Sequence, residues 1–219
     1  VLAWSGGGLS FLSFQRSRGL QMEAVAALPF HWWHLLGHPL ATEYRYGSLE
    51  LDVAGAGPAA AIATVIGVVL LGWLGVARLL GRLERVAPAD VVLTAVLVAV
   101  ASSRVFSPQY AVWALGLAAL ALTDPRTRLR PVVPLVAVGA IAAQLVYPLW
   151  YGDLMDGTWF AVALQTLRIL TFLAAVVLAV VRVLVHPPAP DDDVQDLTAP
   201  PEEAVRSRRS EEHTSELQS

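Results

Sequence analysis

The sequence predicts an all-α protein, in which transmembrane helices form a polytopic bundle. Hydrophobic residues make up 56% of its 219 residues and charged residues only 15%, whereas a soluble domain contains about 25% charged residues. Long apolar stretches recur along the chain, and short clusters of Arg separate them. Stretches of this kind indicate that a lipid bilayer surrounds much of the chain.

Three stretches have the length and composition of a transmembrane helix, for which about 20 apolar residues suffice. They are Ala59–Ala77, Val132–Trp150 and Trp159–Val181. Two further stretches, Asp90–Ser103 and Tyr110–Leu122, are apolar but shorter. The apolar pattern by itself allows them to be two short spans that meet at a turn, or the halves of one broken span.

The positions of the Arg residues decide between these two possibilities. One cluster follows the first span and another follows Leu122; together they comprise Arg78, Arg82, Arg85, Arg126, Arg128 and Arg130. Short Arg-rich loops face the cytoplasm, so an even number of spans must lie between the two clusters. We therefore predict two short spans that meet outside the cell at Ser107–Tyr110 (SPQY), where Pro108 suits the first turn of a new helix.

This topology divides the chain into four parts. We expect residues 1–57 to form an extracytoplasmic loop with amphipathic helices, and residues 58–185 to contain five spans. Residues 186–208 are rich in Pro and acidic side chains and are expected to form a disordered cytoplasmic tail. Residues 209–219 (RSEEHTSELQS) resemble the translation of a widely used sequencing adapter, and we exclude them from the fold prediction. Because the chain begins without Met, we expect it to be the later part of a longer protein.

The segment before the first long span has two features that bear on this topology. Gly19–His38 has an amphipathic pattern, which is typical of helices that lie on a membrane surface. Ala24–Ala41 is apolar enough to be a sixth span despite its three His. If it crossed the membrane, Arg16 and Arg18 would be cytoplasmic.

Arg104 and the SPQY that follows it form the first candidate site. One interpretation is an interfacial turn whose Arg reaches the lipid headgroups. The other is an Arg at the rim of a cavity, where it binds a phosphate group, with Gln109 and Tyr110 contacting a sugar. The residues alone favour neither interpretation.

Arg16–Glu23 (RSRGLQME) forms the second candidate site. On a helix, Gly19 and Glu23 would lie one turn apart. The segment is then either the charged face of a surface helix or a site in which two Arg, Gln21 and Glu23 bind a phosphate and sugar hydroxyls.

Two other motifs raise the question of a cofactor. His31, His34 and His38 would share one helical face and could bind a metal, but no carboxylate lies at a matching position. Val53–Ala60 (VAGAGPAA) follows the strand-like LELDV and resembles a dinucleotide fingerprint, but an apolar span follows it rather than an amphipathic helix. The sequence therefore identifies no cofactor with certainty, and it leaves a divalent metal open. The chain contains no Cys, which excludes thiolate metal sites.

Three stretches resemble, in this order, the C-terminal half of the family 87 glycosyltransferases: RGLQME (Arg18–Glu23), YRYGSLEL (Tyr44–Leu51) and RVFSPQYAVW (Arg104–Trp113). The resemblance covers roughly Leu9 to Val183, and RGLQ-x-E and SPQY are its most specific parts. The chain departs from the family at Gln15, where a His is frequent.

This resemblance implies a function at the plasma membrane. The family comprises actinobacterial, multi-pass enzymes of the C-type superfamily, which are similar to mannosyltransferases that use polyprenyl-phosphate mannose outside the membrane. The expected reaction transfers mannose or another hexose from a polyprenyl-phosphate donor to a lipid or glycan acceptor. The expected partners are therefore the donor, the acceptor and membrane lipids, and no nucleic acid is expected to bind. The expected donor-phosphate residues are Arg104, Arg16 and Arg18, and the sugar-positioning residues are Gln21, Glu23, Tyr46, Gln109 and Tyr110. The catalytic residue is expected upstream of this chain.

Two other functions fit a chain with several spans. A transporter or flippase for a lipid-linked or anionic solute would need polar residues within the spans, and the spans contain few, chiefly Gln144, Gln165 and Arg168. A non-catalytic scaffold would act through the acidic tail. We rank the transporter second.

The topology can be tested by cysteine labelling, because the chain has no native Cys. We expect Ser107→Cys to react with a membrane-impermeant maleimide added to intact cells, since SPQY is predicted to lie outside. The control is Arg85→Cys in an Arg-rich loop, which should react only after the cells are permeabilised. Labelling of both positions only after permeabilisation would refute the topology.

Overall fold

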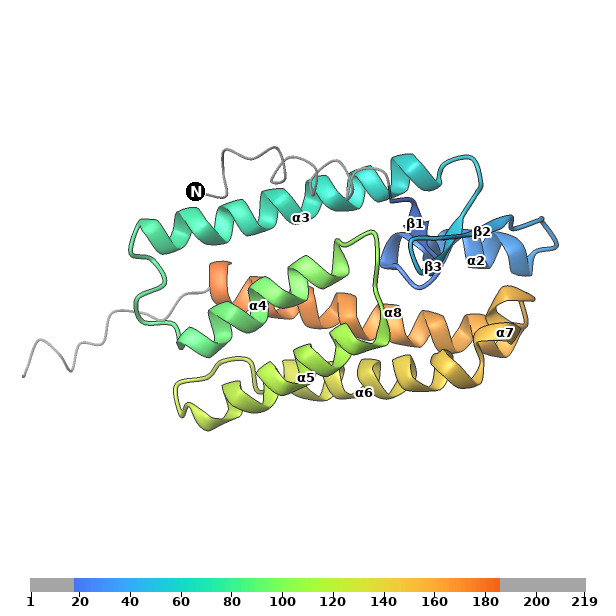
Figure 1. Ribbon diagram of the computed structural model, residues 1–219. Helices are drawn as coiled ribbons and strands as arrows, with labels where there is room; N and C mark the ends of the chain where they lie inside the picture. The colour runs from blue at the N-terminus through green and yellow to red at the C-terminus, as the bar shows by residue number, and fades with distance from the viewer. Residues whose placement is uncertain (1–17, 186–219) are drawn as a thin grey trace, which may run out of the picture. The chain divides into compact units, whose positions relative to one another are not determined.

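A computed structural model describes residues 18–185 of the chain, and these residues are mostly helical (Figure 1). Three helices are long and apolar enough to cross a membrane. They are α3 (Ala56–Leu79), α6 (Val132–Gln144) with its continuation η2 (Leu145–Leu149), and α8 (Trp159–Val180) with its continuation η3 (Val181–Val185). These helices match the three long apolar stretches predicted from the sequence.

Two shorter apolar helices, α4 (Pro88–Ala101) and α5 (Pro108–Thr123), run in opposite directions (Figure 1). The predicted turn therefore exists, and α5 begins at Pro108. At 1.5 Å per residue the 14 residues of α4 extend about 21 Å. This length is below the thickness of a hydrocarbon core, which is about 30 Å.

The Arg-containing loops meet at one end of the helices. The buried Asp90, in the first turn of α4, accepts hydrogen bonds from the Thr127 hydroxyl (2.6 Å) and the Arg128 amide (2.8 Å) in the α5–α6 loop. Arg128 and Arg182 each donate a guanidinium hydrogen bond to the other's backbone carbonyl (3.3 and 2.8 Å). The α3–α4 loop, the α5–α6 loop and the end of α8 therefore share one end.

The other end carries a small antiparallel sheet of three strands in the order β1-β3-β2: β1 (Leu20–Gln21), β2 (Thr42–Arg45) and β3 (Ser48–Leu51). Tyr46 and Gly47 connect β2 to β3 with φ of 50° and 80°, the left-handed pair that a two-residue hairpin requires. In the register, Leu20 lies opposite Leu51 and Gln21 opposite Glu50.

The sequence predicts that residues 1–57 form a loop with amphipathic helices, and the described part of this segment also contains the sheet. Within Gly19–His38 the chain forms β1, a 3-10 turn η1 (Val25–Ala27) and the short helix α2 (Leu28–Leu35). The helical interpretation of RSRGLQME is wrong for its described part, since Leu20–Gln21 is a strand. A pairing with β3, which lies later in the chain, overrides the local helical pattern.

The structure of this region also argues against a sixth span and against a dinucleotide-binding motif. The eight residues of α2 extend about 12 Å, which is too short for Ala24–Ala41 to be a sixth span. The Gly-rich Val53–Ala60 leads from an antiparallel strand into α3, an apolar helix of 24 residues. It therefore lacks the parallel strand–helix–strand unit that binds a dinucleotide. Arg16, Gln15, the 186–208 tail and residues 209–219 lie outside the described residues.

Close packing of α6 against α8 depends on Gly139. A Cβ added at Gly139 would lie 2.7 Å from Cδ2 of the Phe172 ring. Phe172 is fully buried and meets Phe106 edge to face, with ring centroids 4.9 Å apart. The ring therefore cannot move away at low cost, and the small residue sets the distance between these helices.

We expect Gly139→Ala to destabilise the protein by about 1–3 kcal/mol because it overpacks the α6–α8 contact. Gly116→Ala in α5 is the matched control, since a Cβ there would meet nothing within 4 Å. It should be neutral or stabilise by up to about 1 kcal/mol, as Ala favours a helix over Gly. Unfolding in detergent measures both variants, and equal effects would contradict the packing argument.

Candidate functional site

A pocket of about 600 Å³ lies where the sheet meets the α4–α5 turn. Its lining comes from the β1 region, the β2–β3 hairpin, the start of α5, and the segment around η2 and α7 (Tyr151–Met155). Five of the residues predicted to bind the donor line it: Arg18, Gln21, Glu23, Gln109 and Tyr110. The structure thus brings RGLQME and SPQY, which are distant in the chain, to one cavity of a size typical of small-ligand sites.

The remaining predicted residues differ in their relation to the pocket. Arg104 Nη1 donates a hydrogen bond to the Arg18 carbonyl (2.9 Å). Arg18 Nη2 in turn donates to the Tyr46 carbonyl (3.1 Å), and its guanidinium lies 5.9 Å from the centre of the Tyr46 ring. Arg104 and Tyr46 therefore contact the pocket rim through Arg18. Arg16 lies outside the described residues.

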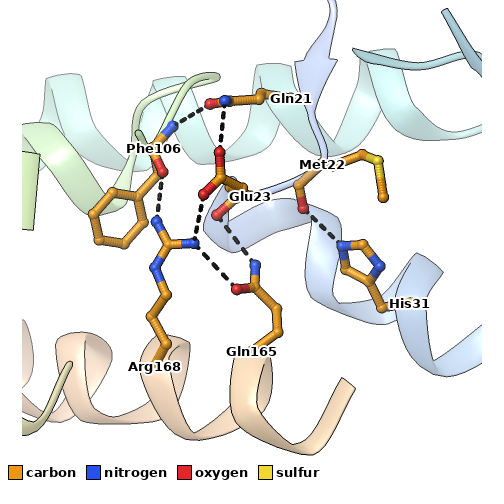
Figure 2. Close-up of polar contacts among 7 residues, drawn as sticks. All are labelled: Gln21, Met22, Glu23, His31, Phe106, Gln165 and Arg168. Carbon is orange, nitrogen blue, oxygen red and sulfur yellow. Dashed lines mark hydrogen bonds and ion pairs between the residues drawn. The ribbon is translucent and has the colours of Figure 1, made fainter. Parts of the chain in front are cut away.

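Gln21 connects β1 to the α4–α5 turn. Its backbone N–H donates to the Arg104 carbonyl (3.0 Å), and its side-chain Oε1 accepts from the Phe106 amide (2.8 Å). Its side-chain Nε2 donates to Glu23 Oε2 (3.0 Å). One amide side chain, through its oxygen and its nitrogen, therefore connects the turn to Glu23 (Figure 2).

Glu23 is a buried carboxylate in the wall of the pocket, with 3% of its surface exposed. Its Oε1 lies 3.4 Å from Nη1 of Arg168 in α8, and its backbone carbonyl accepts from Gln165 Nε2 (3.3 Å). Figure 2 shows Arg168 and Gln165 extending from α8 toward Glu23. Burial raises the pKa of Glu23, and the positive charge of Arg168 opposes this rise.

Arg168 lies behind the pocket wall and holds Glu23, a role that could not be inferred from the sequence. Its side chain is fully buried, and its guanidinium donates to Gln165 Oε1 (3.1 Å) and to the Phe106 carbonyl. The guanidinium carbon also lies 4.3 Å from the centre of the Phe106 ring. The available signal was an Arg within an apolar span, which usually faces a polar partner inside the protein.

Glu50 of β3 contacts the Arg18–Gly19 segment at the edge of the pocket. Its Oε2 accepts from the Gly19 amide (2.9 Å), and its Oε1 lies 4.0 Å from Arg18 Nε. A Cβ at Gly19 would lie 2.7 Å from that Oε2, so a larger residue there would displace the end of the Glu50 side chain. The buried Glu50 thus contacts both the Gly19 backbone amide and the Arg18 guanidinium. Glu43, which lies directly opposite Glu50 in the sheet, carries the same charge. Glu43 is neutralised by a separate contact with Arg45.

Four tyrosines line the pocket: Tyr44, Tyr110, Tyr147 and Tyr151. Tyr147 and Tyr151 meet edge to face, with ring centroids 5.4 Å apart. Burial and the neighbouring Glu23 carboxylate raise the pKa of Tyr151, so its hydroxyl remains a neutral hydrogen-bond donor. Aromatic faces next to hydroxyl, amide, carboxylate and guanidinium groups suit a ligand that has both apolar faces and many hydroxyls.

The three His of the proposed metal motif have separate partners. The buried His31 donates from Nε2 to the Met22 carbonyl (2.7 Å), and His34 donates from Nδ1 to the His38 carbonyl (2.7 Å). The His38 ring stacks on Trp33, with centroids 3.7 Å apart. Among residues 18–185, no three His, Asp or Glu side chains are grouped so that they could hold a metal ion.

Comparisons with known proteins add no assignment. No protein-family model, curated protein or solved structure matches this chain.

His31 should make the stability of the site region depend on pH. Burial lowers the pKa of His31 from its ordinary value of 6.5, because the Met22 contact only partly offsets the desolvation of a charged ring. The unfolded chain therefore takes up this proton more readily than the folded chain, so the free energy of unfolding is highest above pH 6.5 and falls below it.

We expect His31→Gln to reduce this loss of stability at acid pH, since Gln has no titrating group and can still donate to the Met22 carbonyl. Unfolding of both proteins, measured between about pH 7.5 and 5 to cover the range around an ordinary His pKa, tests the prediction. Parallel pH profiles for the two proteins would show that His31 does not titrate as expected.

Proposed function

We propose that this chain is the C-terminal part of a polytopic membrane glycosyltransferase similar to family 87. It would transfer mannose or another hexose from a polyprenyl-phosphate donor to a lipid or glycan acceptor on the extracytoplasmic face of the plasma membrane. The observation that carries this proposal is the shared pocket. Residues from all three stretches that resemble the family line it, including Arg18, Ser48 and Gln109.

The chemistry of the lining fits a sugar attached to a phosphate. The Arg18 guanidinium at the rim carries the charge and the donor geometry that bind phosphate oxygens. The tyrosine rings offer faces for the apolar side of a hexose, and the Glu23 carboxylate can accept hydrogen bonds from sugar hydroxyls. Arg104 would act both by its charge and by holding the Arg18 backbone in position.

The proposed transfer proceeds as a substitution at the anomeric carbon. An acceptor hydroxyl oxygen forms a bond to that carbon while the bond to the phosphate oxygen breaks, and the phosphate leaves with the electron pair. Arg18 and Arg104 would stabilise the negative charge that develops on the leaving phosphate. The proton of the acceptor hydroxyl would pass to a base, which we expect in a part of the protein upstream of this chain.

The arrangement of the helices is compatible with this sidedness. The pocket lies at the end that holds the SPQY turn, and the Arg-containing loops lie at the opposite end. With the Arg-rich end in the cytoplasm, as the positive-inside rule requires, the pocket would open on the outer face. A lipid-phosphate donor would then present its sugar to the pocket from the same leaflet.

No observation favours the transporter alternative. That alternative relied on polar residues within the spans, and two of the three, Gln165 and Arg168, are engaged by Glu23 and Phe106. Both are fully buried and hold Glu23, which lines the pocket, so they do not line a path along the helices.

We expect Arg104→Ala to reduce transfer by 100-fold or more in the full-length protein, which is about the effect of removing one charge-stabilising donor from an active site. The assay measures radiolabelled mannose transferred from polyprenyl-phosphate mannose in membranes. Arg45→Ala is the matched control, because Arg45 is exposed on the hairpin and is paired with Glu43. It should retain nearly normal transfer.

Protein amount and thermal unfolding of both variants must match the wild type for this comparison. Near-normal turnover of Arg104→Ala would exclude the phosphate role. Failure of the wild-type protein to transfer any hexose from polyprenyl-phosphate donors would overturn the proposed function itself.

A further inference from the structure

A second cavity lies on the side of α2 and is separate from the pocket described above. This groove has a volume of about 430 Å³. All of its lining residues have apolar side chains: Pro29, Phe30, Trp33, Pro39, Leu40, Val53 and Ala54. The groove shares no lining residue with the pocket described above, whose lining contains tyrosines and charged side chains. The lining therefore favours a hydrocarbon over a sugar or a phosphate.

The groove adjoins the first residues of a membrane-length helix. Val53 and Ala54 precede α3, which begins at Ala56. The 24 residues of α3 extend about 36 Å, slightly more than a hydrocarbon core of about 30 Å. If α3 crosses the membrane, its first turn lies at the boundary between headgroups and hydrocarbon, and so do the two groove residues just before it.

The helix α2 next to the groove presents large apolar side chains to its surroundings. Trp32, Trp33 and Leu36 are 44%, 55% and 72% exposed. Trp is enriched at membrane interfaces, since its ring is apolar and its N–H is polar. Contact with lipid would remove these apolar side chains from water.

The groove is also preformed. Trp33, one of its walls, is stacked against His38 with the rings nearly parallel. Phe30, another wall, packs against the backbone at Gly55, where an added Cβ would lie 3.6 Å from the ring. Two prolines, Pro29 and Pro39, restrict the backbone on either side of these residues. Little ordering is therefore needed when a chain enters.

We propose that this groove binds one acyl chain of a phospholipid from the leaflet that surrounds the start of α3. The site would anchor α2 at the membrane surface beside the sheet. The proposal rests on the crossing of the membrane by α3 and is independent of glycosyl transfer. It can therefore fail while the proposed function holds, or hold while that function fails.

Photocrosslinking of the protein in lipid vesicles tests this site. The vesicles contain phosphatidylglycerol and a phosphatidylcholine with a diazirine in one acyl chain, and mass spectrometry locates the labelled peptides. We expect labelling of residues 28–40 and of the exposed side chains of α3, such as Val65 and Ile66. Ala54→Trp fills the groove, so it should reduce labelling of residues 28–40 at least fivefold and leave the α3 labelling unchanged.

The control is Ala41→Trp, which adds the same bulk at an exposed position that is not in the groove lining. Trp33→Asp is a second test variant, because it places a charge in the groove at a half-exposed position that tolerates a polar side chain. It should lower labelling of residues 28–40 as Ala54→Trp does.

Three results would overturn the proposal. Residues 28–40 could remain unlabelled while α3 is labelled, which would mean that no chain enters the groove. Labelling of residues 28–40 could be unaffected by both Ala54→Trp and Trp33→Asp, which would mean that the lipid touches only the outer surface of α2. Absence of label from both regions would refute the membrane crossing of α3 and the groove site with it.

Discussion

The ion pair between Arg168 and Glu23 is the interaction on which the rest of this structure depends. A guanidinium that is fully buried in an apolar helix is tolerated only when its hydrogen bonds are supplied by the protein. Arg168 obtains them at its two terminal nitrogens, from Glu23, Gln165 and the Phe106 carbonyl, and its buried Nε alone has no partner among the described residues. Because these partners belong to three different segments, the need to satisfy one charge fixes α8, the β1 region and the α4–α5 turn relative to one another.

The pocket is a consequence of this arrangement. Gln21 joins the same network and holds the turn through the Phe106 amide, and Arg104 then reaches the backbone of Arg18. The polar groups of the pocket therefore gather at one end of the helices, opposite the Arg-containing loops. The ion pair also leaves a carboxylate in the pocket wall whose ionisation is set by two opposing influences, burial and the neighbouring Arg. The polar groups of this cavity are held in place by hydrogen bonds, which is the arrangement expected of a site for a polar ligand.

Much of the helical architecture and part of the site could be predicted from local sequence. The long apolar stretches gave the three long helices, and Pro108 marked the start of α5 correctly. The resemblance to a family identified Arg18, Gln21, Glu23, Gln109 and Tyr110, which share one pocket. The conformation of RGLQME was predicted wrongly, because β1 is only two residues long and exists through its pairing with β3. The contribution of Arg168 and Tyr151 was not predicted either.

The sequence by itself determined where the chain is helical, since the length of an apolar run and the positions of Pro and Arg are local properties that act on the backbone directly. Only the tertiary structure decided which polar residues meet. Glu23 and Arg168 are far apart in the chain, and nothing in the pattern around either one specifies the other. Their contact follows from the packing of α8 against the sheet-bearing end, where burial removes water and leaves each charge the other as its partner.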